Sequence, residues 1–86
     1  MFIIEDEAHA ERRPGEFATL ADALVEVRRL AAISWDETPN IAPCQSWKTC
    51  GRRYEIVEYN NASVPWTEIQ RIPSLNVSAI TTEFLL

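Results

Sequence analysis

The segment that most constrains the fold is an amphipathic pattern over residues 20 to 33. Apolar side chains recur there at spacings of three and four, the period of an α-helix with one buried face. Thr19 precedes the pattern as a favourable N-cap, and Asp22 follows it by three residues as a capping-box partner. Arg28 and Arg29 lie where a basic side chain complements the helix dipole. A single helix of this kind must cover another element, because it cannot bury its apolar stripe alone.

The segments on either side of this helix favour β-strands. Residues 2 to 8 begin with three apolar side chains and become acidic, which predicts a first strand with one buried and one solvated end. Proline and glycine in residues 12 to 15 predict a turn after it. Residues 46 to 50 and 53 to 59 are expected to be strands of an antiparallel hairpin that turns around Gly51.

The rest of the chain is less regular. Residues 34 to 44 contain two prolines and no periodicity, so they are expected to form a long loop. Residues 64 to 72 fit either a helical turn or an edge strand, and Pro73 is expected to interrupt either one. Residues 75 to 79 alternate apolar and polar side chains and predict a final strand, which residues 81 to 86 either extend or leave frayed.

One strongly helical segment among period-two segments indicates an α+β fold. We expect one amphipathic helix packed on a three- to four-stranded, mainly antiparallel sheet, in the order β-α-β-β-β. Residues 1 to 86 are expected to form a single small domain, since no break in composition is long enough for a linker.

Charge and glycine content argue against several functions. Thirteen acidic residues against eight basic ones give a net charge of −5, which opposes contact with nucleic acid and with anionic membranes. No apolar run approaches the roughly 20 residues of a membrane-spanning helix, and no basic stretch precedes the first apolar residues, so a cytoplasmic location is expected. Gly15 and Gly51 are the only glycines, so a glycine-rich phosphate loop cannot be built and no cofactor is expected.

Cys44 and Cys50 are the candidates for thiol chemistry. Both would lie on one face of an extended strand, but roughly 20 Å apart, which is too far for a disulfide unless the segment doubles back. The interpretation as structural free thiols is favoured over redox pairing or metal binding. His9 is the only other soft ligand in the chain and is remote in sequence, so neither a metal site nor a cysteine and histidine catalytic pair is expected.

An interaction surface is the remaining hypothesis. Tryptophan and arginine dominate many interfaces, and the long loop leads directly into an aromatic and basic segment. The candidate binding residues are Trp35, Trp47, Lys48, Arg52, Arg53 and Trp66. The opposing interpretation is that the tryptophans cap the edge of a small core and bind nothing.

The sequence therefore predicts a small non-enzymatic protein-interaction or structural module. Its expected partner is another protein or a second copy of itself, as a homodimer. One alternative is a thiol-dependent redox or metal-binding protein that uses Cys44 and Cys50. Another is a small acidic regulator of a basic partner, which the net charge of −5 allows.

Overall fold

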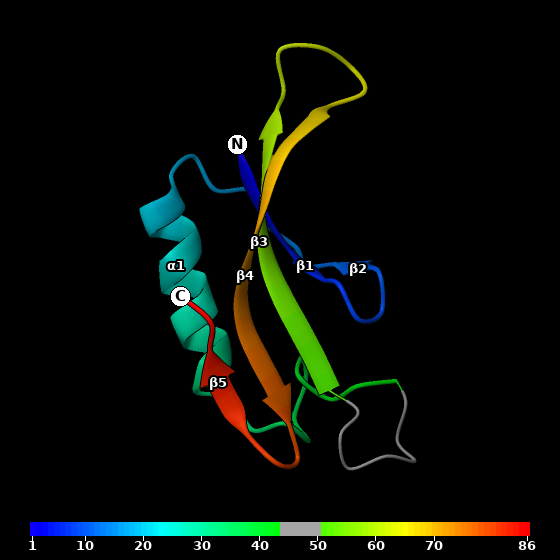
Figure 1. Cartoon of the computed structure of the whole chain (residues 1–86), viewed down its shortest axis with the longest axis vertical. Helices are drawn as coiled ribbons and strands as arrows, with labels where there is room; N and C mark the ends of the chain where they lie inside the picture. The colour runs from blue at the N-terminus through cyan, green and yellow to red at the C-terminus, as the bar shows by residue number, and fades with distance from the viewer. Residues whose placement is uncertain (44–50) are drawn as a thin grey trace.

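One helix packs against one face of a single antiparallel sheet in the computed structural model, which describes residues 1–43 and 51–86 (Figure 1). The sheet has five strands in the spatial order β2-β1-β3-β4-β5. In chain order the elements are β1 (Phe2–Asp6), β2 (Glu11–Arg12), α1 (Leu20–Ala31), β3 (Gly51–Asn60), β4 (Thr67–Ser78) and β5 (Thr82–Phe84). The α+β prediction is confirmed. The sheet has more strands than expected because β2 and β5 are short pieces that the pattern of apolar residues does not reveal.

The helix forms as its sequence predicts. Thr19 has extended backbone angles, and its hydroxyl oxygen accepts a hydrogen bond of 3.1 Å from the backbone N–H of Asp22. The buried residues of α1 are Ala23, Val27 and Leu30, one stripe of the predicted period. They pack against buried side chains of three strands, namely Ile4, Tyr54, Ile56, Leu75 and Val77. The core therefore lies between α1 and one face of the sheet, which leaves the other face uncovered by a helix.

The carboxyl end of α1 is held by Asn40, a residue that the sequence pattern does not single out. Its side chain is 1% exposed. The amide nitrogen donates to the backbone oxygens of Leu30, at 2.8 Å, and of Ile33, at 2.9 Å. Its oxygen accepts a hydrogen bond of 2.8 Å from the hydroxyl of Tyr54. Asn40 thus adds a donor to two carbonyl groups at the end of the helix and links them to β3. Burial raises the pKa of Tyr54 to about 12, so the hydroxyl remains a donor.

The prediction that a hairpin turns around Gly51 is wrong. Gly51 is the first residue of β3, and the hairpin that includes β3 joins it to β4 through residues 61–66, far from Gly51 (Figure 1). Glycine is required for a different reason, because a Cβ at this position would overlap the backbone oxygen of Val77 on β4. The predicted strand over residues 46 to 50 lies outside the described residues.

Pro73 does not interrupt the chain as predicted, because β4 runs through it. Tyr54 lies opposite Leu75, whereas Glu55 lies opposite Pro73, so Ser74 is an extra residue in β4. This irregularity is a β-bulge, one of the positions where a strand tolerates proline. The hydroxyl of Ser74 donates to the backbone oxygen of Ile72 at 2.7 Å. The undecided segment from residue 64 to residue 72 is therefore resolved as a loop followed by the first half of β4.

The carboxyl end of the chain turns back instead of extending the preceding strand. β4 ends at Ser78, and residues 79–81 turn the chain into β5, which pairs antiparallel with β4. This corrects the expectation that residues 75 to 79 form the last strand. In Figure 1 the end of the chain beyond β5 runs beside α1.

We expect Asn40→Ala to lower the free energy of unfolding by about 2 to 4 kcal/mol, because it removes the side-chain donor to the carbonyls of Leu30 and Ile33 and leaves the buried hydroxyl of Tyr54 without its acceptor. Urea unfolding measures this change. Asn61→Ala is the matched control, since Asn61 is exposed and its replacement should change stability by no more than about 0.5 kcal/mol. An equal effect of the two variants would contradict the structural role of Asn40.

Candidate functional site

A buried carboxylate organises the end of the sheet where β3 begins. Asp6 is 0% exposed and both of its oxygens are occupied. Oδ1 accepts from the backbone N–H groups of Ala8, at 3.1 Å, and Arg53, at 3.0 Å. Oδ2 lies 2.7 Å from Nδ1 of His9 and accepts from the guanidinium of Arg52 at 2.9 Å. A buried charge with this many partners is compensated, so Asp6 fixes the turn after β1 against the start of β3.

Arg52, a predicted interface residue, is part of this cluster. Its side chain is 12% exposed, pairs with Glu11 as well as Asp6, and donates to the backbone oxygen of Ile41 at 2.8 Å. Burial opposes the charge, but the hydrogen bonds to Asp6 and Glu11 outweigh it and raise the pKa of Arg52 above its ordinary value. The arginine therefore holds the structure together at this end.

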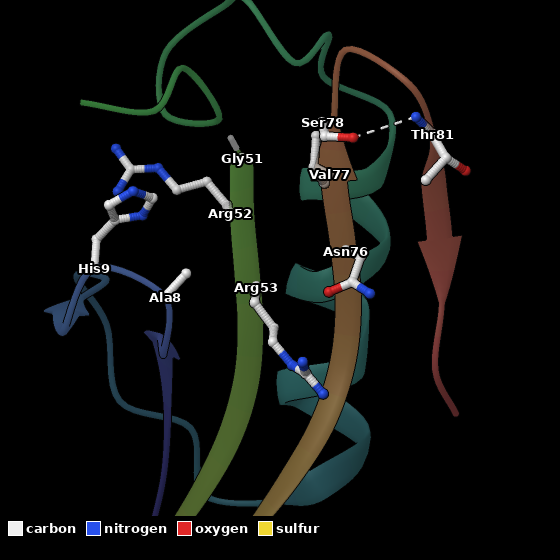
Figure 2. A pocket seen from close by; sticks show the side chains of 9 residues that line it. All are labelled: Ala8, His9, Gly51, Arg52, Arg53, Asn76, Val77, Ser78 and Thr81. Carbon is white, nitrogen blue, oxygen red and sulfur yellow. Dashed lines mark hydrogen bonds between the residues drawn. The ribbon is translucent and has the colours of Figure 1, made fainter. Parts of the chain in front are cut away.

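Arg53 is the neighbour of Arg52 and has a different environment. It is exposed, and its guanidinium makes no ion pair or hydrogen bond with residues 1–43 or 51–86. Figure 2 shows Arg52 directed toward His9, whereas Arg53 extends across the sheet toward β4, with its guanidinium below Asn76. Both belong to an open pocket of about 340 Å³ at this end of the sheet. We call it the basic pocket; its lining residues are Ala8, His9, Gly51, Arg52, Arg53, Asn76, Val77, Ser78 and Thr81.

The sheet face opposite α1 carries a network of ion pairs centred on Arg71. Its guanidinium donates to Glu5 at 3.0 Å, Glu55 at 3.2 Å and Glu68 at 2.9 Å. The hydroxyl of Tyr59 also donates to Glu5, at 2.7 Å. Burial alone would raise the pKa of Glu5, but the hydrogen bonds from Tyr59 and Arg71 and the nearby arginine charges lower it overall. Glu5 held ionised in this way is a poor general acid.

The predicted aromatic anchors are dispersed. Trp66 is half-buried at the loop end of the hairpin, with its ring 6.1 Å from that of Tyr59. Trp35 is 45% exposed in the segment after α1. Trp66 follows the end of β3 opposite to the one where Arg53 lies, a separation of roughly 25 Å at ~3.3 Å per residue. The structure therefore does not bring Trp66 together with Arg53.

Four predicted site residues cannot be placed. Trp47, Lys48, Cys44 and Cys50 lie outside the described residues, so the thiol and loop-surface hypotheses stay predictions. Among the residues that the structure describes, no three histidine, aspartate or glutamate side chains converge as metal ligands. In residues 1–43 and 51–86 there is also no helix with the length and apolarity needed to cross a bilayer.

A second surface, which the sequence pattern did not indicate, lies between α1 and the edge strand β5. We call it the edge groove. It encloses about 450 Å³ and is lined by Leu24, Val27, Arg28, Phe84 and Leu86. Phe84 and Leu86 are 53% and 62% exposed, which is unusual for large apolar side chains that lie together. Arg28 is exposed and forms no ion pair within the described part of the chain.

The backbone of β5 is open along this groove. The N–H of Ser78 donates to the oxygen of Thr81 at 2.9 Å, and the N–H of Leu85 donates to the oxygen of Ser74 at 3.0 Å. In an antiparallel ladder alternate residues of a strand bond to the same neighbour. The odd-numbered residues therefore face β4, and the N–H and C=O groups of Thr82 and Phe84 point to the free edge of the sheet.

We expect Arg52→Ala to lower the free energy of unfolding by about 3 kcal/mol or more, because it leaves the buried carboxylate of Asp6 without its guanidinium partner. Thermal and urea unfolding measure the effect. Arg53→Ala is the matched control from the next position and should stay within about 0.5 kcal/mol of the parent protein, since only its side chain is lost. Similar stabilities for the two variants would show that the Asp6 cluster does not hold this end of the sheet.

We expect Glu5→Gln to weaken the loss of stability in acid. The pKa of Glu5 in the fold lies below the ordinary 4.5, so its ionised form contributes stability that is fully present above that pH and is lost as the pH falls through the lowered pKa. Unfolding free energies measured from about pH 6 to about pH 3 should fall less steeply in this variant than in the parent protein. Glu16→Gln, at an exposed position, should leave the slope unchanged.

Comparisons with known proteins assign no family to this chain. No protein-family model, no curated protein and no solved structure matches it.

Proposed function

We propose that the protein is a non-enzymatic interaction module that binds an extended segment of a partner protein at the edge groove. The segment would pair with β5 as an added strand and place alternate side chains between β5 and α1. One observation carries the proposal. The backbone N–H and C=O groups of Thr82 and Phe84 form no hydrogen bond with the described residues and lie beside the exposed apolar side chains of Phe84 and Leu86. Strand addition uses such groups for affinity and adjacent pockets for specificity.

The lining of the edge groove defines the chemistry of the partner segment. Leu24, Val27, Phe84 and Leu86 favour apolar side chains at alternating positions. Arg28 contributes a guanidinium with no ion pair among the described residues, so a carboxylate on the segment complements it. The partner segment is therefore extended, apolar on one face and acidic at one position.

A second copy of the chain is the competing occupant. Further exposed apolar residues, including Leu20, Val25 and Ile80, would support a dimer built on this edge. However, β5 has three residues and offers outward backbone groups at two of them, which suits a short segment better than a large interface. The net charge of −5 on each copy also opposes self-association.

We expect Thr82→Pro to abolish partner binding without unfolding the protein. The N–H of Thr82 points to the free edge, so proline removes a donor that β4 does not use and obstructs the incoming strand. Octapeptides selected from a random display library against the parent protein supply the probes. Fluorescence anisotropy should show binding at least about tenfold weaker for Thr82→Pro, given the lost hydrogen bond and the added steric obstruction.

Two controls and one mass measurement complete this test. Thr82→Val keeps the N–H and should keep the affinity, whereas Arg28→Glu should weaken acidic peptides and favour basic ones. Equal peptide affinity for Thr82→Pro and Thr82→Val would overturn strand addition. A sedimentation mass of two chains for the parent and one chain for Thr82→Pro would overturn the partner-segment proposal in favour of a homodimer.

A further inference from the structure

We infer that the basic pocket is a second binding site, separate from the edge groove, and that its ligand carries a carboxylate group. The pocket lies at the end of the sheet where β3 begins and β4 ends. Arg53 and Asn76, which line it, alternate with the residues that face α1, so they lie on the opposite face of the sheet from the edge groove.

The charge of this pocket is opposite to that of the whole protein. The net charge is −5, yet none of the nine lining residues is acidic and two are arginines. Two carboxylates outside the lining, those of Asp6 and Glu11, pair with the guanidinium of Arg52. Asp6 is fully buried and also accepts from the backbone N–H groups of Ala8 and Arg53. Asp6 and Glu11 therefore neutralise Arg52, whereas neither pairs with the guanidinium of Arg53.

Arg53 is positioned to bind an anion. Its backbone N–H is fixed by Asp6 at 3.0 Å, and its backbone oxygen accepts from the N–H of Glu7 at 2.9 Å. The strand thus holds the residue in place while the guanidinium stays without an ion pair in the described part of the chain. A planar guanidinium presents two parallel donors that match a carboxylate. One such fork carries a single positive charge, which suits a carboxylate better than a doubly charged phosphate.

Neighbouring polar groups extend this donor set. Figure 2 shows the amide of Asn76 above the Arg53 guanidinium and Ser78 at the far end of the pocket. The oxygen of Ser78 already accepts from the backbone N–H groups of Ile80, at 3.2 Å, and Thr81, at 3.4 Å. Its hydroxyl hydrogen is therefore available to donate. A cavity of about 340 Å³ is large enough for a small acid or for the side chain of an acidic residue.

The carboxylate could belong to a free small acid or to a protein side chain. Titrating the protein with probes of each kind distinguishes the two. Acetate and succinate represent free small acids, and a capped Gly-Asp-Gly tripeptide represents a protein carboxylate. Amide chemical shifts, recorded by NMR on the parent protein, should move at Gly51, Arg53, Asn76 and Ser78 with at least one of these probes. Tighter binding of the tripeptide than of the free acids would identify a protein ligand, and the reverse order would identify a metabolite.

The expected result is that Arg53→Gln weakens the best probe by about tenfold, the lower range for a hydrogen bond to a charged group. Asn76→Leu should also weaken it, whereas Arg28→Gln, on the edge groove, should leave it unchanged. Melting temperatures confirm that each variant is folded. Unchanged affinity in Arg53→Gln, an equal loss in Arg28→Gln, or tighter binding of inorganic phosphate than of every carboxylate would overturn the inference. None of these outcomes depends on whether peptides bind at β5.

Discussion

The buried charge of Asp6 is the interaction on which this end of the molecule depends. An ionised carboxylate without water must be matched by donors, and Asp6 obtains them from the turn after β1 and from two consecutive residues of β3. Through Arg52 the same cluster reaches Glu11 and the backbone of Ile41. Segments far apart in sequence are thereby fixed at one point, and that point determines where Arg53 is presented to solvent.

The two faces of the sheet are stabilised by different interactions, apolar packing on one and ion pairs on the other. The face toward α1 is an apolar core, which the Asn40 bridge crosses from the helix end to Tyr54. The face away from α1 buries Val57 completely under a layer of long charged side chains such as that of Arg71. Arginine stems cover apolar surface while their head groups pair with glutamates. This arrangement lets a small domain use many acidic residues without a second helix.

The features that could be predicted from the sequence are those whose determinants lie within one short segment. The helix was predictable because its period, its cap and its polar face are all contained in one segment. Gly51 and Pro73 mislead at the level of sequence because glycine indicates a turn and proline indicates a break. The structure instead uses Gly51 for close approach to Val77 and Pro73 at a bulge. Asp6 and Asn40 gave no signal, since their roles exist only when residues distant in sequence supply their partners.

The same limit applies to the two surfaces. Arg52 and Arg53 are adjacent and look equivalent in sequence, yet the alternation of a strand directs the Arg52 side chain into an ion cluster with Asp6 and leaves the Arg53 side chain exposed. The edge groove could not be foreseen at all, because it requires the turn at residues 79–81 to return the chain beside α1.

The turn between β4 and β5 connects the two surfaces. The backbone N–H of Ser78, a residue of the basic pocket, donates to the oxygen of Thr81, which directly precedes the first residue of β5. Val77, which also lines the basic pocket, is paired with Thr82 of β5. The end of β4 and the turn after it are therefore the direct structural links between the two surfaces. Arg53 and Asn76 lie on the sheet face opposite the edge groove, so one ligand does not block the other.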